Sequence, residues 1–261
     1  MSAQSSKLGT ALVTGASSGI GRAFARQLAR DGFDLILVAR RAERLAELSQ
    51  ELGAAGIEAE ALVADLATDE GLGIVEQRLC TDPQISMLVN NAGFAHFGAH
   101  LEESPDSAEA GLRVMVLATV RLTRAVLPGF LKAGRGTVIN VSSRAAFGVN
   151  ARLSTYSAAK AYVNRYTLGI AEEFESQGLR FLAVCPGNVQ TELFERAGID
   201  PESMRGCLQP EQVVEASLTA LAKGERVCVP GERGRDRMIR SLLPTGLAKK
   251  LANYMNRIAG C

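Results

Sequence analysis

The stretch Thr10-Ala-Leu-Val-Thr-Gly-Ala-Ser-Ser-Gly-Ile-Gly21 decides the fold, because it leads from a short apolar strand through a glycine-rich turn into a helix. Thr10–Thr14 has the composition of a strand, and Ile20–Arg30 repeats apolar residues at a spacing of four, as a helix does. Glycines in such a turn let an anion approach the backbone, and the N–H groups of the first helical turn face that anion. The turn is therefore a candidate pyrophosphate site. The alternative is a tight turn that binds no ligand.

Strands and helices continue to alternate after this turn. Helices of ten or more residues between short apolar strands indicate parallel βαβ units. We therefore predict an α/β fold: a single Rossmann-type domain over residues 1–261, with a doubly wound parallel sheet of about seven strands flanked by helices. The further strands are expected at Leu35–Ala39, Ala59–Ala64, Ser86–Asn90, Gly136–Val141, Phe181–Cys185 and Arg226–Val229, and the further helices at 42–52, 69–80, 107–131, 155–177 and 210–222.

Composition excludes several classes of protein. With 47% hydrophobic and 22% charged residues, the 261-residue chain can bury a large core, and a net charge of +1 disfavours a nucleic-acid partner. Apolar runs such as Leu35–Ala39 are too short to span a bilayer, so no transmembrane segment is expected, and the polar Met1–Lys7 is unlike a secretory signal. Five scattered cysteines without a CxxC pair indicate reduced thiols, a cytoplasmic protein and no metal site.

The segment 232–261 departs from this even balance of charge. It holds seven Lys and Arg residues against two acidic ones, and its leucines are roughly helix-spaced. We expect a basic amphipathic segment that forms solvated helices packed on the core or on a second subunit. A helix on a membrane surface and a grip on an anionic substrate are the alternatives.

Four motifs in order resemble the short-chain dehydrogenase/reductase family, in its shorter single-domain branch. They are TGASSGIG at 14–21, Asn90-Asn-Ala-Gly93, Tyr156-Ser-Ala-Ala-Lys160 and Pro186-Gly187, and the resemblance runs from about Leu8 to Val229. It implies an oxidoreductase that transfers a hydride between a nicotinamide cofactor and a small carbonyl or alcohol substrate. It also implies a homodimer or homotetramer.

Three side chains are candidates for the chemistry. Tyr156 and Lys160 are four residues apart, so both lie on one face of a helix, where a cation lowers the pKa of a phenol and suits it to proton transfer. An ordinary surface pair is the alternative. Ser143 follows the fifth strand, where a hydroxyl can donate to a substrate oxygen. The resemblance makes Ser143 that stabiliser, Tyr156 the acid/base, and Lys160 the group that tunes the pKa and binds the ribose.

The end of the second strand indicates the cofactor. Arg40 and Arg41 stand where an acidic residue would hold the ribose of NAD, and an arginine there accommodates the 2′-phosphate of NADP. We predict NADP (NADPH), with Arg40 as the main ligand and Arg41 and Ser17 assisting. Solvated arginines are the alternative. The resemblance adds as cofactor-binding residues Gly15, Ser18, Gly19, Ile20 and Gly21 of the turn, Asp65 and Leu66 near the adenine, Asn91, Ala92 and Gly93, Tyr156 and Lys160, and Pro186, Gly187, Val189 and Thr191.

One position departs from the family pattern. Alignment of Arg113–Val120 puts Met115 where the family usually has an asparagine that holds a water of the proton relay behind Lys160. A thioether cannot donate a hydrogen bond. Met115 either simply packs in the helix core, which we favour, or marks a slowed or altered enzyme.

Three classes of function follow. The leading one is an NADPH-dependent carbonyl reductase or alcohol dehydrogenase for a lipophilic ketone or aldehyde, since Ala145–Leu153 and the loop after Thr191 are largely apolar. The second is a 3-oxoacyl-thioester reductase whose basic segment 232–261 grips an acyl carrier or coenzyme A. The third is an NADP(H)-binding sensor with little turnover, which Met115 suggests.

Overall fold

The structure, a computed structural model, describes residues 8–195 and 206–231. Seven parallel strands form one sheet in the order β3-β2-β1-β4-β5-β6-β7, so the predicted fold is confirmed. The basic segment 232–261 lies outside the described residues. The strands are β1 Thr10–Thr14, β2 Asp34–Ala39, β3 Ala59–Val63, β4 Ile85–Asn90, β5 Gly136–Val141, β6 Leu179–Val184 and β7 Val227–Cys228. The helices are α1 Gly19–Arg30, α2 Ala42–Ala54, α3 Asp69–Thr81, α4 Pro105–Leu112, α5 Ala118–Ala133, α6 Ser154–Phe174, α7 Glu192–Glu195 and α8 Pro210–Ala222.

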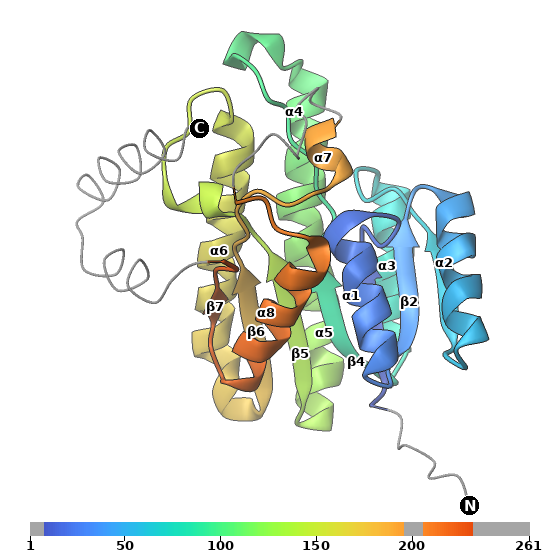
Figure 1. Cartoon of the computed structure of the whole chain (residues 1–261). Helices are drawn as coiled ribbons and strands as arrows, with labels where there is room; N and C mark the ends of the chain where they lie inside the picture. The colour runs from blue at the N-terminus through green and yellow to red at the C-terminus, as the bar shows by residue number, and fades with distance from the viewer. Residues whose placement is uncertain (1–7, 196–205, 232–261) are drawn as a thin grey trace, which may run out of the picture.

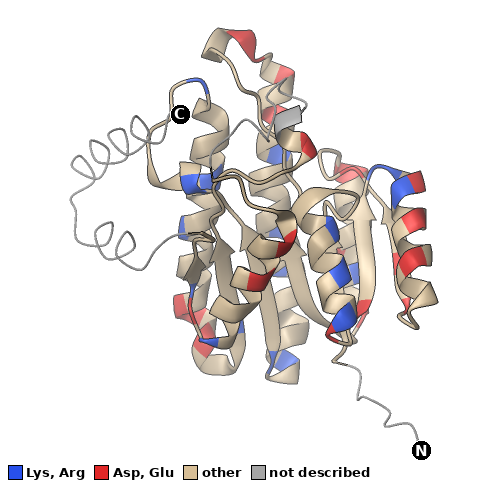
Figure 2. Cartoon of the chain, in the orientation of Figure 1, with Lys and Arg blue, Asp and Glu red and all other residues tan. Residues whose placement is uncertain are grey.

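Helices cover both faces of the sheet (Figure 1). On one face α1, α2 and α8 bury Phe24, Leu48 and Val213 against the strands. On the other face α3, α5 and α6 bury side chains such as Leu72 and Phe130. The strands have apolar residues on both sides because each side meets a layer of helices. Figure 2 shows acidic and basic residues interspersed over the outer helices, in line with the near-zero net charge.

The order of winding reverses between β1 and β4, which is where open α/β sheets bind ligands beyond their carboxyl ends. Polar contacts hold this point together. The backbone N–H groups of Asn91 and Ala92 donate to Thr14 Oγ1 at 2.9 and 3.1 Å. The Asn91 side chain donates to the Thr14 carbonyl oxygen at 2.9 Å. The loops after β1 and β4 therefore start from fixed positions.

The predicted helix 107–131 is longer and less regular than expected. It runs as α4, a π-helical turn at Arg113–Leu117, and α5. At the turn Thr119 Oγ1 donates to the Met115 carbonyl oxygen at 2.9 Å, so the hydroxyl satisfies a backbone acceptor where the regular pattern is interrupted. The position that departs from the family pattern therefore lies in a local irregularity of this helix.

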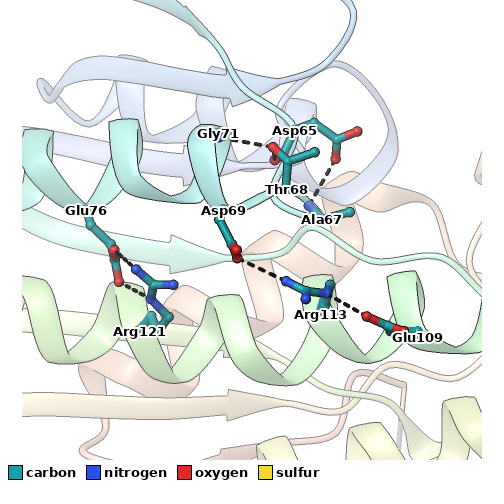
Figure 3. Close-up of polar contacts among 9 residues, drawn as sticks. All are labelled: Asp65, Ala67, Thr68, Asp69, Gly71, Glu76, Glu109, Arg113 and Arg121. Atoms are coloured by element: carbon teal, nitrogen blue, oxygen red, sulfur yellow. Dashed lines mark hydrogen bonds and ion pairs between the residues drawn. The ribbon is translucent and has the colours of Figure 1, made fainter.

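The same helix passes a test that single apolar runs do not. Over Pro105–Ala133, 29 residues with a mean hydropathy of 1.5 in the most apolar window, it is long and apolar enough to cross a membrane by length and composition alone. Charged and hydroxyl residues interrupt its apolar positions, so no continuous run is seen. Its packing is that of a core helix: Leu122 and Phe130 are buried, and Arg113 and Arg121 pair with Asp69 and Glu76 of α3 (Figure 3).

Candidate active site

The glycine-rich turn after β1 is closely packed. Gly15 and Gly19 have φ of +69° and +53°, which favours glycine. A Cβ on Gly21 would overlap the Gly15 carbonyl oxygen, and one on Gly15 would lie 2.7 Å from the Asn91 amide nitrogen. Ser18 precedes α1 without making a side-chain cap, so its hydroxyl does not occupy the N–H groups of the first turn. These open donors at a helix N-terminus suit a pyrophosphate, and the partly buried Ile20 packs beneath them on the core.

The guanidinium at this turn belongs to Arg41. Its Nη2 donates to the hydroxyls of Ser17 and Ser18, each at 2.8 Å. Arg40 has a side chain 61% exposed, and its Nη1 lies 3.7 Å from Asp65. From the sequence we predicted Arg40 as the main ligand of the 2′-phosphate. In the structure Arg41 is the arginine that contacts the glycine turn, so its position suits a 2′-phosphate better. Adjacent residues of an extended segment point to opposite sides, so only one of the two side chains can face the turn.

The turn after β3 holds the two residues expected near an adenine. Asp65 Oδ1 accepts the backbone N–H of Ala67 at 3.0 Å, and Thr68 caps α3 by accepting the N–H of Gly71 at 3.0 Å (Figure 3). Leu66 is buried. This turn is therefore rigidly built, and Asp65 keeps one carboxylate oxygen for the contact with Arg40.

Ser143, Tyr156 and Lys160 are brought together at the end of β5. Ser143 lies close enough to Tyr156 for its side chain to lower the pKa of the phenol. Lys160 Nζ lies 5.7 Å from the centre of the Tyr156 ring and donates to the Val141 carbonyl oxygen at 2.8 Å. Ser142 donates to the Lys160 carbonyl oxygen at 2.8 Å, which ties the end of β5 to α6.

Burial dominates the electrostatics of this cluster. Burial raises the pKa of the Tyr156 phenol, and the hydrogen bond with Ser143 offsets part of this rise. Burial outweighs the effect of Ser143, so the pKa of the phenol lies above its ordinary value, and Lys160 is not among the causes of this shift. Burial also lowers the pKa of Lys160 to about 8. The phenol is therefore protonated at neutral pH, and the amine is close to its titration point.

Gly93 and Met115 lie directly beside the amine of Lys160. A Cβ on Gly93 would be 3.3 Å from Met115 Cγ and 3.4 Å from Lys160 Nζ. Met115 is 2% exposed, so its side chain is packed, as we favoured. The thioether nevertheless occupies space next to the candidate proton-transfer group.

The segment after β6 runs between this cluster and the glycine turn. Pro186 accepts the backbone N–H of Arg144 at 2.8 Å, and a Cβ on Gly187 would lie 3.1 Å from Arg144 Cδ. Val189 is buried. A Cβ on Gly19 would lie 2.9 Å from the Thr191 methyl group, so the segment reaches the start of α1. All the candidate cofactor residues therefore lie along one edge of the sheet.

Three residues near the site were not predicted from the sequence. Arg144 supports Pro186 and Gly187, and Cys185 is buried where its charge would influence both Tyr156 and Lys160. Glu192, at the start of the unpredicted helix α7, pairs with Arg41. Its signal in the sequence was an acidic side chain directly after Thr191 in a largely apolar loop. Of the apolar residues expected to contact substrate, Val149 is 75% exposed, and Ile199 and Met204 lie outside the described residues.

Comparison with known proteins decides the family. A model of the short chain dehydrogenase family matches residues 9–201, most of the chain. The chain belongs to the short-chain dehydrogenase family. The resemblance that the motifs indicated is thus confirmed. The Rossmann-type fold and the oxidoreductase class that it implied are confirmed with it.

Curated relatives and solved structures agree with this short-chain dehydrogenase assignment. An uncharacterised oxidoreductase of Staphylococcus saprophyticus is 34% identical over 84% of this chain and 93% of its own length. A very-long-chain 3-oxoacyl-CoA reductase of Anas platyrhynchos is 28% identical over 95% of this chain and 80% of its own. A short-chain dehydrogenase from Sphingobium yanoikuyae in complex with NADPH has a TM-score of 0.85 and 37% identity, over 88% of this chain and 91% of that one. The bulky-bulky ketone specific alcohol dehydrogenase from Comamonas testosteroni has a TM-score of 0.82 and 30% identity, over 89% and 90%.

Proposed function

We propose that this chain is an NADP(H)-dependent oxidoreductase that interconverts a carbonyl compound and its alcohol, with a lipophilic ketone or aldehyde as substrate. The observation that carries the proposal is the position of Tyr156, whose phenol is influenced by the Ser143 side chain and whose ring centre lies 5.7 Å from Lys160 Nζ. Two hydroxyl donors side by side can hold one carbonyl oxygen between them. The ketone-specific alcohol dehydrogenase among the structural neighbours supports a carbonyl substrate.

The protonation state of the cluster suits carbonyl reduction. A bound nicotinamide would supply or accept the hydride at the substrate carbon. Tyr156 is a protonated phenol at neutral pH because burial raises its pKa, so its hydroxyl proton is available to the carbonyl oxygen. Ser143 donates a hydrogen bond to the same oxygen as negative charge develops on it. Lys160 lies one helical turn away, where its cation stabilises the phenolate that remains.

The preference for NADP(H) rests on Arg41. Its guanidinium is held at the glycine turn by the hydroxyls of Ser17 and Ser18, and guanidinium binds phosphate through paired hydrogen bonds. The NADPH complex of the Sphingobium relative supports this choice. Arg40 Nη1 lies 3.7 Å from Asp65, and we propose that both residues line the adenosine.

Replacement of the phenol hydroxyl tests the proposed chemistry. We expect the wild-type chain to oxidise NADPH with members of a panel of steroid, quinone and aldehyde carbonyls, and Tyr156→Phe to lower kcat at least about 100-fold, the typical share of general acid catalysis. NADPH binding, measured by calorimetry, stays within a few-fold because the ring remains. Unchanged kcat in the variant contradicts the role of Tyr156. Tight NADPH binding without turnover of any carbonyl identifies the sensor instead.

The matched arginine variants test the cofactor preference. Arg41→Ala should weaken NADPH binding by about tenfold or more, the order of a charged hydrogen bond to phosphate, and leave NADH binding nearly unchanged. Arg40→Ala, which removes the same charge one residue earlier, should have the smaller effect on NADPH because its side chain is 61% exposed and lies by Asp65. Equal losses for the two nucleotides in Arg41→Ala would refute the argument.

A second candidate function is reduction of a 3-oxoacyl thioester. The similarity to very-long-chain 3-oxoacyl-CoA reductases over most of the chain favours it. Under this alternative the same three side chains act on the 3-oxo group, so the chemistry is unchanged and only the substrate differs. A kcat/KM for an acetoacetyl thioester at least tenfold above that of every simple ketone in the panel would select this function, and the reverse order would reject it.

A further inference from the structure

Two arginines grip the carboxylate of Glu192. Arg41 Nη1 lies 2.6 Å from Glu192 Oε2, and Arg44, in the first turn of α2, pairs with the other carboxylate oxygen. All three side chains are only partly exposed, with Arg41 at 31% and Glu192 at 28%. Burial opposes ionisation of the carboxyl, but the hydrogen bonds from Arg41 and Arg44 outweigh it and lower the pKa of Glu192. Glu192 is therefore a fixed negative charge at neutral pH.

This carboxylate lies on the guanidinium that the glycine turn holds. While Nη1 of Arg41 contacts Glu192, Nη2 contacts the hydroxyls of Ser17 and Ser18. A bound 2′-phosphate would place an anion at this same guanidinium. Glu192 supplies an anion from the protein itself, and it comes from a segment 151 residues further along the chain.

The neighbouring residue fixes the segment in this position. The Thr191 methyl group packs on Gly19, so 191–192 lies across the start of α1. Arg44 contacts Glu192 independently of Arg41, so the carboxylate keeps a partner if Arg41 turns to another anion. Among the residues that the structure describes, both Arg41 and Arg44 pair with this carboxylate, and Arg41 also contacts the turn.

We propose that Glu192 is a specificity-determining residue that competes with the 2′-phosphate of NADP(H) for Arg41. This inference rests on the proposed NADP(H) function. A 2′-phosphate carries about −1.5 to −2 charges and outcompetes a single carboxylate, which Arg44 then retains. NAD(H) brings no phosphate to this position, so the pair of Arg41 with Glu192 persists when it binds. Glu192 therefore reduces the affinity for NADP(H) but not for NAD(H). It thus moderates the preference for NADP(H) that Arg41 creates.

Nucleotide binding to Glu192→Gln tests the competition directly. We expect the Kd of NADPH, measured by calorimetry without substrate, to fall roughly two- to five-fold, the range of a partly exposed ion pair. The Kd of NADH should stay unchanged, so the ratio of the two constants shifts. Glu43→Gln is the matched control. It removes an exposed acidic charge one residue from Arg44 on α2, and among the described residues Glu43 pairs with neither arginine.

Each outcome decides one proposal. A lower Kd for NADPH with an unchanged Kd for NADH in Glu192→Gln, but not in Glu43→Gln, supports the competition, and a higher Kd for NADPH overturns it. An unchanged ratio, or equal weakening of both nucleotides, overturns it and leaves Glu192 as a tether of the segment after β6. A wild-type chain that binds neither NADPH nor NADH overturns the proposed function itself, which is a separate result. Circular dichroism of each variant verifies that these substitutions of partly exposed side chains leave the fold intact.

Discussion

Lys160 shows how burial sets chemistry at the scale of one residue. The residue is 5% exposed, and its amine donates a hydrogen bond to the Val141 carbonyl oxygen. Such surroundings solvate an ammonium less well than water does, so the pKa falls to about 8. The amine that should stabilise a phenolate and bind a ribose therefore titrates close to physiological pH.

This pKa predicts a pH-dependent affinity for cofactor. Below about pH 8 the amine is charged, and above it the amine becomes neutral, so NADPH binding should weaken as pH rises from 7 to 9.5. We expect a loss of about tenfold, the order of one charge-assisted hydrogen bond. Calorimetric titration across this range measures it. Lys160→Met, which cannot titrate, should bind weakly with a flat profile. The same slope in both proteins would contradict the assignment to Lys160.

The joined helices α4 and α5 are the clearest case at the scale of elements. A π-helical turn at Arg113–Leu117 places Met115 beside Gly93 and Lys160. Thr119 satisfies the Met115 carbonyl oxygen, so the irregular turn leaves this acceptor paired. The turn therefore presents a thioether to the space beside the amine.

Met115→Asn tests what that thioether does. A polar side chain there can hold a water beside the amine, so we expect kcat to be kept or raised. Folding stability should fall by about 1–3 kcal/mol, because a polar group replaces a buried apolar one. Steady-state kinetics and urea unfolding measure the two effects. A large loss of kcat in a folded variant would reject the hypothesis.

Two glycines of α3 form a matched pair for stability. A Cβ on Gly71 would overlap the Asp65 carbonyl oxygen, whereas one on Gly73 meets no atom within 4 Å. Gly71→Ala should therefore cost about 1–3 kcal/mol of unfolding free energy, and Gly73→Ala should gain about 0.5–1 kcal/mol from helix propensity. Urea titrations measure both values. Effects of the same sign at the two positions would contradict the close approach of α3 to the turn after β3.

At the scale of the whole molecule, apolar side chains remain exposed on the long helices. Leu112 is 43% exposed, Leu117 39% and Tyr162 46%. The family resemblance predicts association through these helices, and Val116 and Val120 nearby are only partly buried. The homodimer or homotetramer therefore remains a prediction. The exposed apolar residues of these helices are the surface through which we expect it to form.

Light scattering after size exclusion tests this assembly. We expect the wild-type chain to elute as a dimer or tetramer and Leu117→Glu to shift toward monomer, because a charge in an apolar interface is costly. Leu101→Glu changes a side chain that is 96% exposed in a short turn outside these helices and should leave the assembly unchanged. A monomeric wild-type chain would disprove the prediction.

The sequence alone determined the features that depend on local physics. Alternating apolar runs predicted strands and helices close to their observed bounds, since periodicity follows from which face is buried. Glycine spacing predicted the turn, and helical geometry placed Tyr156 and Lys160 on one face. The π-helical turn and α7 were missed, because neither has a periodicity of its own.

Only the tertiary structure decided which distant groups meet. It put Arg41 rather than Arg40 at the glycine turn, because the backbone direction at the end of β2 selects one side chain. It joined Glu192 to Arg41 across 151 residues, and it raised the pKa of Tyr156 by burying the phenol. Contacts and desolvation of this kind arise when segments that are distant in the sequence pack together. No local pattern of residues shows which segments will meet.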